Sequence, residues 1–446
     1  MKLHLKPLSD QVIVITGASS GIGLATARMA AERGAKVVLA ARSEGALQQL
    51  AEEIQGKGGR AHVVVADVAK PEDLTRIADE ARATFGGFDT WVNNAGIGMY
   101  GRLDAVSVDD MRRLFDTNVW GLVQGSLEAI RHLKQHGGAL INVGSEVSER
   151  AVPLQGAYSA SKHAVKGFTD ALRMELEDED APVSVTLIKP GQIDTPFTVN
   201  AKNYLDSEPQ HVPPVYAPGA VAEAILTAAV KPVRDVFVGG GAKAVAEMAH
   251  LAPGLTDKGM NASVIPGTPS GKPPRRERDG SGLDVPTEAL EERGNYEGRV
   301  METSLYTKAA LNPLLTGAFV AGAGLLLGAI VKGLPHRPVA MRGDAGMTTM
   351  KALHIHLEAK PGREVEVEDL LRDILACVGR ELATSPWYGV RLSHSTFGIF
   401  EAFPDEAGRE AHLTGEGAAI LMKRSNALLA QPARIDKLDV LMSKRD

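Results

Sequence analysis

A glycine-rich turn that directly follows an apolar run is the feature that most constrains what this chain can fold into. Residues 12–16 read VIVIT, and the sequence TGASSGIG then runs from Thr16 to Gly23. Glycine permits a tight turn and lets a phosphate approach the backbone, while the following helix presents free N–H groups and the positive end of its dipole. A purely structural turn is the competing interpretation. Because this turn leaves a strand and opens a helix, it predicts a dinucleotide-binding site at the start of an α/β domain.

Strand and helix patterns alternate from this turn to about residue 250. Such alternation is typical of a parallel sheet with helices on both faces, and continuous apolar runs are expected where both faces of a strand are buried. We expect strands at residues 12–16, 36–41, 61–66, 90–93, 139–143, 183–188 and 235–238. We expect helices at residues 21–33, 45–55, 73–85, 111–134 and 157–176. Residues 1–252 therefore form the first predicted domain.

The composition excludes several classes of protein. The 446 residues include 49 Lys plus Arg and 55 Asp plus Glu, a net charge of −6, whereas a dedicated nucleic-acid-binding protein carries a basic excess. Cys377 is the single cysteine, so an internal disulfide framework and a cysteine-based zinc site are excluded. The N-terminal residues lack the apolar stretch of a secretory signal, which predicts a cytoplasmic first domain. We expect no nucleic-acid partner and no metal site.

The sequence changes character after residue 252. Residues 253–313 are rich in Pro, Gly and charged residues, which predicts a linker or an extended tail. Residues 314–331 contain no charge and would extend ~27 Å as a helix, the lower bound for a membrane span. Two interpretations stay open for this segment: membrane association, in which Gly324 and Gly328 form a GxxxG pair, and a buried or interfacial helix of a soluble assembly.

Residues 347–446 have the pattern of an independent small domain. An alternating strand at its start is followed by a helical stretch at residues 363–382, strands near residues 387–393 and 396–402, a helix at 405–429 and a last strand near 434–441. This βαββαβ order predicts a ferredoxin-like α+β fold.

The residues at the ends of the second, third and fourth strands indicate which cofactor is bound. Residues 40–42 read AAR, so no carboxylate is placed to bind the ribose hydroxyls, and Arg42 can contact a phosphate. This favours NADP(H) over NAD(H), although Arg42 as a solvated cation is the alternative. Asp67 is expected to hold the adenine amino group. The sequence NNAG at residues 93–96 places a further glycine turn at the carboxyl edge of the sheet.

A tyrosine and a lysine four residues apart predict acid–base chemistry. Tyr158 and Lys162 lie one turn apart on one face of a helix, and an ammonium group beside a phenol lowers its pKa. Tyr158 would then donate a proton to a carbonyl oxygen or remove one from an alcohol. Ser145, at the end of the fifth strand, is expected to hydrogen-bond the same oxygen. Asn118 lies inside a helical pattern for which its propensity is mediocre, which favours a polar role.

These motifs resemble those of the short-chain dehydrogenase/reductase family. The resemblance rests on TGASSGIG, NNAG, Asn118, Ser145, the YSASK sequence at residues 158–162, and Pro190-Gly191 followed by Thr195, and it covers residues 8 to 250. It implies a Rossmann-type, doubly wound parallel sheet of seven strands, a nicotinamide cofactor, and a catalytic tetrad of Asn118, Ser145, Tyr158 and Lys162. In the family, the asparagine holds a water that relays protons behind the lysine. Members are commonly dimers or tetramers, so a homo-oligomer is expected.

The motifs and the resemblance together predict the cofactor contacts and part of the substrate pocket. A moderately apolar carbonyl or alcohol is expected against walls that include Met99, Tyr100, Val147, Val152, Pro153 and Leu154, some of which are core residues in the alternative interpretation. Residues 197–215 are expected to form a lid. The predicted cofactor contacts are Thr16, Gly17, Ser19, Ser20, Gly21, Ile22, Gly23, Arg42, Asp67, Val68, Asn94, Ala95, Gly96, Tyr158, Lys162, Pro190, Gly191, Ile193 and Thr195.

The C-terminal domain resembles the antibiotic biosynthesis monooxygenase superfamily of dimeric α+β barrels. The resemblance rests on AKPGRE at residues 359–364, the strand-to-helix run at 398–413 and the final strand. We do not assign oxygenase chemistry, and satisfied or solvated roles are favoured over metal or haem binding for His354, His356, His394 and His412.

The sequence thus predicts an NADP(H)-dependent oxidoreductase that interconverts a carbonyl and a secondary alcohol. The alternative is an NADP(H)-binding sensor or scaffold whose C-terminal module binds a ligand or has oxygenase-like activity.

Overall fold

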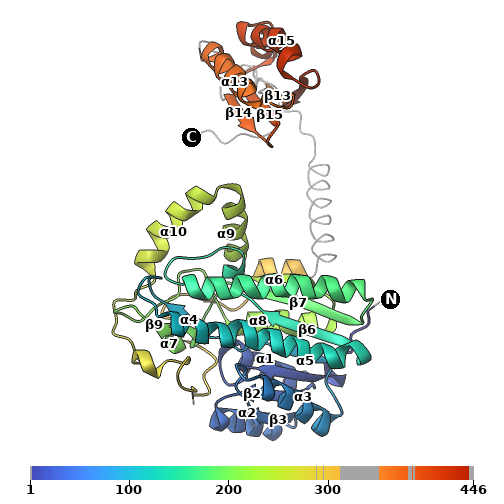
Figure 1. Cartoon of the computed structure of the whole chain (residues 1–446), viewed down its shortest axis with the longest axis vertical. Coiled ribbons are helices and arrows are strands. Elements are labelled where there is room, and N and C mark those ends of the chain that lie inside the picture. Colours follow the sequence, from blue (N-terminus) through green and yellow to red (C-terminus); the bar gives the residue numbers. More distant parts are fainter. Residues whose placement is uncertain are drawn as a thin grey trace, which may run out of the picture. The chain divides into compact units, whose positions relative to one another are not determined.

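The chain divides into two compact units, residues 1–333 and 334–446, which are described separately (Figure 1). The computed structural model describes residues 3–287, 289–294, 296–311, 351–379, 384 and 387–440. The apolar segment 314–331 lies outside these ranges. Within them, no helix combines the length and apolar character that a membrane crossing requires.

A seven-stranded parallel sheet forms the centre of the first unit. Its strands lie in the order β11-β7-β6-β4-β1-β2-β3, and every neighbouring pair is parallel. The order reverses between β1 and β4, where parallel α/β sheets leave a crevice at their carboxyl edge. This confirms the predicted Rossmann-type sheet, whose strands are β1 (Val12–Thr16), β2 (Lys36–Ala41), β3 (Arg60–Val65), β4 (Thr90–Asn93), β6 (Gly138–Val143), β7 (Val183–Pro190) and β11 (Asp235–Val238).

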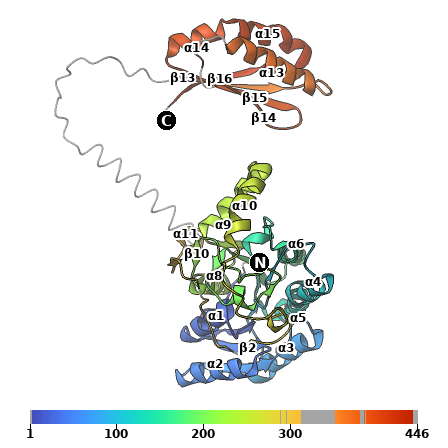
Figure 2. The same ribbon diagram turned by 90° about the vertical axis from the view of Figure 1, so that its left-hand side faces the viewer.

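Helices cover both faces of this sheet, and Figure 2 shows the two layers on either side of it. One layer contains α1 (Gly21–Glu32), α2 (Glu44–Gly56) and α8 (Pro218–Val230), and the other α3 (Pro71–Phe85), α5 (Gly121–His136) and α6 (Gly156–Asp178). In β1, Ile13 and Ile15 pack into the first layer, whereas Val12 and Val14 pack into the second. Burial on both sides explains why this strand is apolar at each of these positions.

The long helix expected at residues 111–134 is interrupted. The structure has α4 (Val108–Phe115), a π-helical turn at Asp116–Trp120, and then α5. Ser107 caps α4 by accepting a hydrogen bond from the Asp110 N–H. Because a π-turn inserts an extra residue into a helix, it redirects the side chains within it, and such turns occur often at functional sites.

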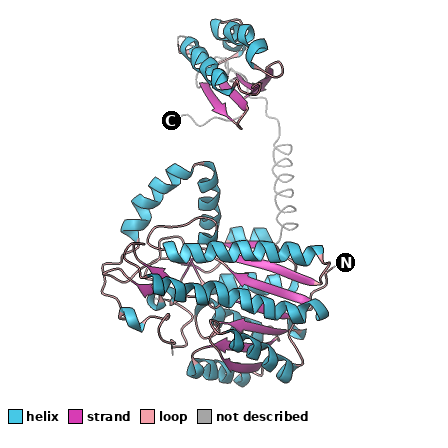
Figure 3. Ribbon diagram, in the orientation of Figure 1, coloured by secondary structure: helices cyan, strands magenta, loops and turns pink. Residues whose placement is uncertain are grey.

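Short elements surround the carboxyl edge of the sheet. β5 (Met99–Tyr100) pairs with β9 (Lys202–Asn203), and β10 (Val215–Tyr216) pairs with both β8 (Gln192–Ile193) and β12 (Val300–Met301). These pairings bring loops that are distant in the sequence to one end of the sheet. The remaining helices of this unit are α7 (Phe197–Asn200), α9 (Gly240–Leu251), α10 (Pro253–Gly267) and α11 (Leu305–Leu311); α9 and α10 project from the sheet as a pair (Figure 3).

The structure differs from the linker or tail expected at residues 253–313. After α10, an irregular segment that we call the strap (residues 281–287 and 289–294) packs against the first domain. Asp284 pairs with Lys202 at 2.9 Å and with Arg113 at 2.9 Å, and Glu292 pairs with Arg28 at 3.1 Å. The strap is held largely by ion pairs and backbone hydrogen bonds, so its low apolar content did not indicate that it is ordered.

The second unit contains one antiparallel sheet with helices on one face. Its order is β14-β15-β13-β16, and the connectivity matches the predicted βαββαβ order except that two helices, α14 and α15, replace the expected single helix. Cys377 is buried in α13, within this helical layer. The elements are β13 (Lys351–Glu358), α13 (Glu364–Val378), β14 (Trp387–Arg391), β15 (Thr396–Phe403), α14 (Glu406–Leu413), α15 (Glu416–Leu428) and β16 (Arg434–Asp439).

Removal of the Asp284 carboxylate should loosen the strap. Lys202 is 3% exposed and would lose one of its partners, so we expect Asp284→Ala to lower the free energy of unfolding by about 1–3 kcal/mol. Limited proteolysis should cut the strap faster in this variant. Asp279→Ala is the matched control, because Asp279 contacts the same lysine at 3.1 Å but is 95% exposed. Equal behaviour of the two variants would show that Asp284 does not anchor the strap.

Candidate functional site

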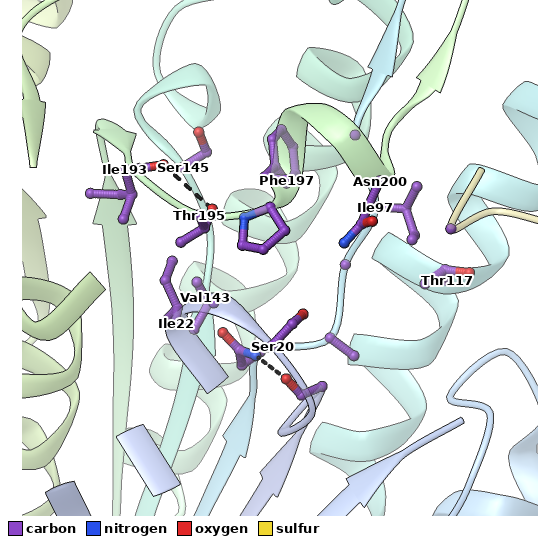
Figure 4. A pocket seen from close by; sticks show the side chains of 18 of the residues that line it. Ser20, Ile22, Ile97, Thr117, Val143, Ser145, Ile193, Thr195, Phe197 and Asn200 are labelled. Atoms are coloured by element: carbon purple, nitrogen blue, oxygen red, sulfur yellow. Dashed lines mark hydrogen bonds between the residues drawn. The ribbon is translucent and has the colours of Figure 1, made fainter. Parts of the chain in front are cut away.

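A single cleft at the carboxyl edge of the parallel sheet collects most of the predicted site residues. It is lined by the loops after β1, β2, β3, β4, β6 and β7, by the start of α6, and by residues of α7 and the strap. Ser145, Ile193 and Thr195 lie on one side of this cleft, opposite Ile97 and Asn200 (Figure 4). Of the predicted catalytic and cofactor residues, Thr16, Gly23 and Asn118 do not line the cleft.

Close contacts with neighbouring segments explain why glycine occupies two positions of the glycine-rich turn. Gly17 has φ +68°, and a Cβ atom there would lie 2.9 Å from the Ala95 Cα atom. A Cβ atom on Gly23 would lie 2.1 Å from the Gly17 carbonyl oxygen. Gly23 therefore permits α1 to pack against the turn, which explains its place in the motif although it lies outside the cleft lining.

Thr16 joins this turn to the loop after β4. Its hydroxyl accepts hydrogen bonds from the N–H groups of Asn94 and Ala95, at 3.0 and 3.2 Å, and donates to the Val92 carbonyl at 3.3 Å. The Asn94 side chain donates to the Thr16 and Gly17 carbonyls at 3.0 and 3.2 Å. Thr16 does not line the cleft, but it holds Asn94 and Ala95, which do.

The turn fits the pyrophosphate of a dinucleotide. Ser19, Ser20, Gly21 and Ile22 line the cleft where α1 begins, and the first N–H groups of a helix have no partner within it. The Gly21 N–H donates to the Glu291 carbonyl of the strap at 2.9 Å. The next N–H groups along α1 and the serine hydroxyls form a donor set suited to phosphate oxygens.

The strap covers the part of the cleft formed by the ends of β2 and β3. Arg42 donates from Nη2 to the Gly282 carbonyl, and the Ser43 hydroxyl donates to the Thr287 carbonyl at 2.5 Å. Gly282, Pro286 and Thr287 line the cleft together with Arg42, Asp67 and Val68. Asp67 accepts a hydrogen bond from the Ala69 N–H at 3.1 Å, which orients one of its carboxylate oxygens. Sequence reasoning did not identify the strap residues as part of the site.

Tyr158, Ser145 and Lys162 lie together in the cleft and are 8%, 8% and 4% exposed. Burial raises the pKa of Tyr158, and a hydrogen bond with Ser145 offsets part of that increase. Burial also lowers the pKa of Lys162 to about 8. The Lys162 ammonium group donates to the Val143 carbonyl at 2.9 Å and lies 5.8 Å from the centre of the Tyr158 ring. In a buried pair of a phenol and an amine, a nearby charge changes the pKa of both groups, and such shifted pKa values are typical of sites that transfer protons.

Asn118 lies in the π-turn and holds the loop after β4. Its Oδ1 atom accepts from the Ile97 N–H at 2.8 Å, and its Nδ2 atom donates to the Ile97 carbonyl at 2.9 Å. A Cβ atom on Gly96 would lie 3.4 Å from Asn118 Oδ1 and 3.7 Å from Lys162 Nζ, so the three residues meet around one point. Asn118 is 1% exposed and positions this loop beside Lys162.

The residues predicted to lie beside the nicotinamide ring line the cleft, but only some of the residues predicted to form the substrate walls do so. Pro190, Gly191, Ile193 and Thr195 line the cleft. Tyr100 and Val147 also line it, whereas Met99, Val152, Pro153 and Leu154 do not. From the expected lid, Phe197, Asn200 and His211 line the cleft, and the Phe197 ring contacts the Tyr158 ring edge-on at 5.3 Å.

Three polar residues of the cleft form a hydrogen-bonded group that was not predicted, although His211 belongs to the expected lid. Glu146 lies in the short helical turn after β6, Gln192 in β8 and His211 in the loop before β10, and all three line the cleft. Gln192 Nε2 donates to Glu146 Oε1 at 2.7 Å, and His211 Nδ1 lies 3.1 Å from Gln192 Oε1. The position of Glu146 directly after Ser145 was the one signal in the sequence that pointed to this group.

The histidines of the second unit do not gather at one point. His354 lies 3.9 Å from Asp436, His394 is 90% exposed, and His412 pairs with the buried Glu401 at 3.0 Å on the helix-covered side. Across the described parts of the chain, no three His, Cys, Asp or Glu residues are arranged to hold a metal ion.

Comparison with known proteins identifies the first domain. Residues 11–205 match the family model for short chain dehydrogenases. An uncharacterized oxidoreductase of Bacillus subtilis, YxnA, is 51% identical over 324 residues, which cover 72% of this chain and 91% of that protein. An 11-beta-hydroxysteroid dehydrogenase A of Sesamum indicum is 38% identical over 198 residues, which cover 44% of this chain and 56% of that protein.

A solved structure is similar as well. A short chain dehydrogenase/reductase from Burkholderia phymatum, in complex with NAD, is 26% identical, with a TM-score of 0.52 and coverage of 56% of this chain and 96% of that chain. The parallel sheet, the glycine-rich turn and these matches agree. The chain belongs to the short-chain dehydrogenase/reductase family and is an oxidoreductase of that type.

Proposed function

We propose that this protein interconverts a carbonyl compound and a secondary alcohol with NADP(H), and that Tyr158 transfers the proton. The observation that carries the proposal is the meeting of Tyr158, Ser145 and Lys162 in the cleft that also contains the glycine-rich turn. A sensor would not need a buried phenol, hydroxyl and amine at one place. The bound cofactor would supply or accept the hydride.

The roles of the side chains follow from their positions. The Ser145 hydroxyl orients the substrate oxygen, and Tyr158 donates its proton to that oxygen as reduction proceeds. The Lys162 ammonium group stabilises the phenolate that results, because a nearby positive charge favours the ionised phenol. Asn118 acts through the loop that it holds beside Lys162 and is a positioning residue. That it also holds a relay water stays a prediction.

The preference for NADP(H) rests on Arg42 and on the residues around it. The strand ends in Ala41 without a carboxylate, and Arg42 and Ser43 follow in the cleft lining. A guanidinium group has five N–H donors, and the hydrogen bond to Gly282 uses one of them. The remaining donors are suited to a 2′-phosphate, and the Gly282 carbonyl orients the guanidinium group toward the cleft.

The second unit contributes no residue to this proposal. Three expectations stay predictions from the sequence: the homo-oligomer that the family resemblance implies, the resemblance of the second unit to the monooxygenase superfamily, and the membrane association of residues 314–331.

Loss of the phenol oxygen should abolish turnover without loss of the cofactor. We expect Tyr158→Phe to lower kcat for NADPH-dependent carbonyl reduction by about 100- to 10,000-fold, the usual contribution of a positioned proton donor. Oxidation of NADPH at 340 nm with a panel of aldehydes and ketones measures turnover, and calorimetric titration with NADPH measures binding. Turnover retained in Tyr158→Phe would show that another group transfers the proton.

Removal of the guanidinium group should affect one cofactor only. We expect Arg42→Ala to lower kcat/KM for NADPH by about 10- to 100-fold, the size of one lost charge-assisted hydrogen bond, and to change that for NADH much less. Arg60→Ala is the matched control, because Arg60 begins the neighbouring strand and does not line the cleft. Equal losses with NADPH and NADH would contradict a 2′-phosphate contact.

A further inference from the structure

Glu146, Gln192 and His211 form a polar wall within an otherwise largely apolar substrate region. We infer that Glu146 accepts a hydrogen bond from a hydroxyl group that the substrate carries near its reacting carbonyl, so that hydroxy-carbonyl compounds are the preferred substrate class. This inference rests on the proposed function and names the substrate class of the same site.

The hydrogen bonds of the wall are consistently directed toward Glu146. His211 is 7% exposed, and its Nδ1 atom is placed to donate to Gln192 Oε1 at 3.1 Å. Gln192 Nε2 in turn donates to Glu146 Oε1 at 2.7 Å. Since both bonds present donors toward the carboxylate, Glu146 is held as an acceptor.

One oxygen of this carboxylate has no partner. Within the described ranges of the chain, no hydrogen bond or ion pair involves Glu146 Oε2. Glu146 is half-buried and lines the cleft, so a ligand can reach this oxygen. An ionised carboxylate accepts hydrogen bonds at both oxygens, and a substrate that displaced water here without donating a hydrogen bond would leave one oxygen unsatisfied, at a cost. Burial raises the pKa of Glu146, and the hydrogen bond from Gln192 offsets part of that increase. A ligand that donates a hydrogen bond would satisfy the second oxygen.

The location of Glu146 places that donor near the reacting group. Glu146 directly follows Ser145 and begins the short helical turn Glu146–Ser148. After burial, which is the largest cause, the charge of Glu146 contributes to the raised pKa of Tyr158. Both side chains line the cleft, and Tyr158 hydrogen-bonds Ser145, the residue directly before Glu146, so a substrate bound there can contact both residues.

The surroundings select a neutral hydroxyl group over a charged group. A substrate carboxylate would be repelled by Glu146, and a substrate ammonium group would share the cleft with the buried ammonium of Lys162. Ile97, Tyr100, Val147 and Phe197 provide apolar contacts for the rest of the molecule. The geometry thus fits an apolar body with a hydroxyl group near the carbonyl.

The test compares two ketones that differ by one hydroxyl group. The probes are 3-hydroxy-1-phenylpropan-1-one and 1-phenylpropan-1-one, and the measured quantity is the ratio of their kcat/KM values with NADPH. We expect the wild-type enzyme to prefer the hydroxy ketone by about tenfold or more, the size of one hydrogen bond to a charged group. Glu146→Gln should reduce this preference by about tenfold, chiefly through a higher KM for the hydroxy ketone.

Two further variants separate this role from a structural one. Gln192→Leu keeps the Glu146 carboxylate but removes the group that orients it, so the preference should fall by less than in Glu146→Gln. Glu149→Gln is the matched control: Glu149 lies three residues along the same loop, pairs with Lys189 at 2.9 Å and does not line the cleft. The Glu149→Gln variant should show the same ratio of kcat/KM values for the two ketones as the wild type.

The possible failures can be told apart. Equal turnover of both ketones by the wild type, or an unchanged preference in Glu146→Gln, would overturn this inference and leave the proposed function standing. Turnover of neither ketone would overturn the proposed function for this class of carbonyl together with the inference.

Discussion

The close packing of α1 against the loop after β4 sets the geometry on which the rest of the site depends. A Cβ atom on Gly23 would lie 2.6 Å from the Asn94 Nδ2 atom and 2.1 Å from the Gly17 carbonyl oxygen, and Asn94 in turn is hydrogen-bonded to Thr16 at the end of β1. This contact fixes the start of α1 beside the residues that follow β4. Asn118 then holds the next part of that loop beside Lys162, so one continuous set of contacts links the glycine-rich turn to the proton-transfer group.

Burial of charged and ionisable groups gives this site its chemical character. The same desolvation that lowers the pKa of Lys162 raises those of Tyr158 and Glu146, because each neutral form is favoured away from water. The strap increases this shielding at the other end of the cleft, where its carbonyl groups bind Arg42 and Ser43. A cofactor placed in the cleft would therefore lie between the sheet edge and the strap, in surroundings that strengthen electrostatic interactions.

The parallel sheet and the core of the site were predictable from local patterns. Strands such as β1 are apolar throughout because both of their faces are buried, and Tyr158 and Lys162 meet because they lie one helical turn apart. The π-turn around Asn118 was not predictable, because the mediocre helix propensity of its residues does not indicate the extra residue that a π-turn inserts. The strap was missed because Gly282, Thr287 and Glu291 act through backbone carbonyls, which every residue possesses. Glu146, Gln192 and His211 meet only through the tertiary fold.

Transfer of a labelled hydride would show whether the bound cofactor reduces the carbonyl carbon directly. The wild-type enzyme would be incubated with a ketone and NADPH deuterated at C4 of the nicotinamide ring, prepared separately with the label on each face. Mass spectrometry of the alcohol would then locate the deuterium. We expect one deuterium on the former carbonyl carbon from one of the two labelled cofactors and none from the other. Oxidation of NADPH without deuterium in the alcohol from either cofactor would contradict direct reduction of the carbonyl in this cleft.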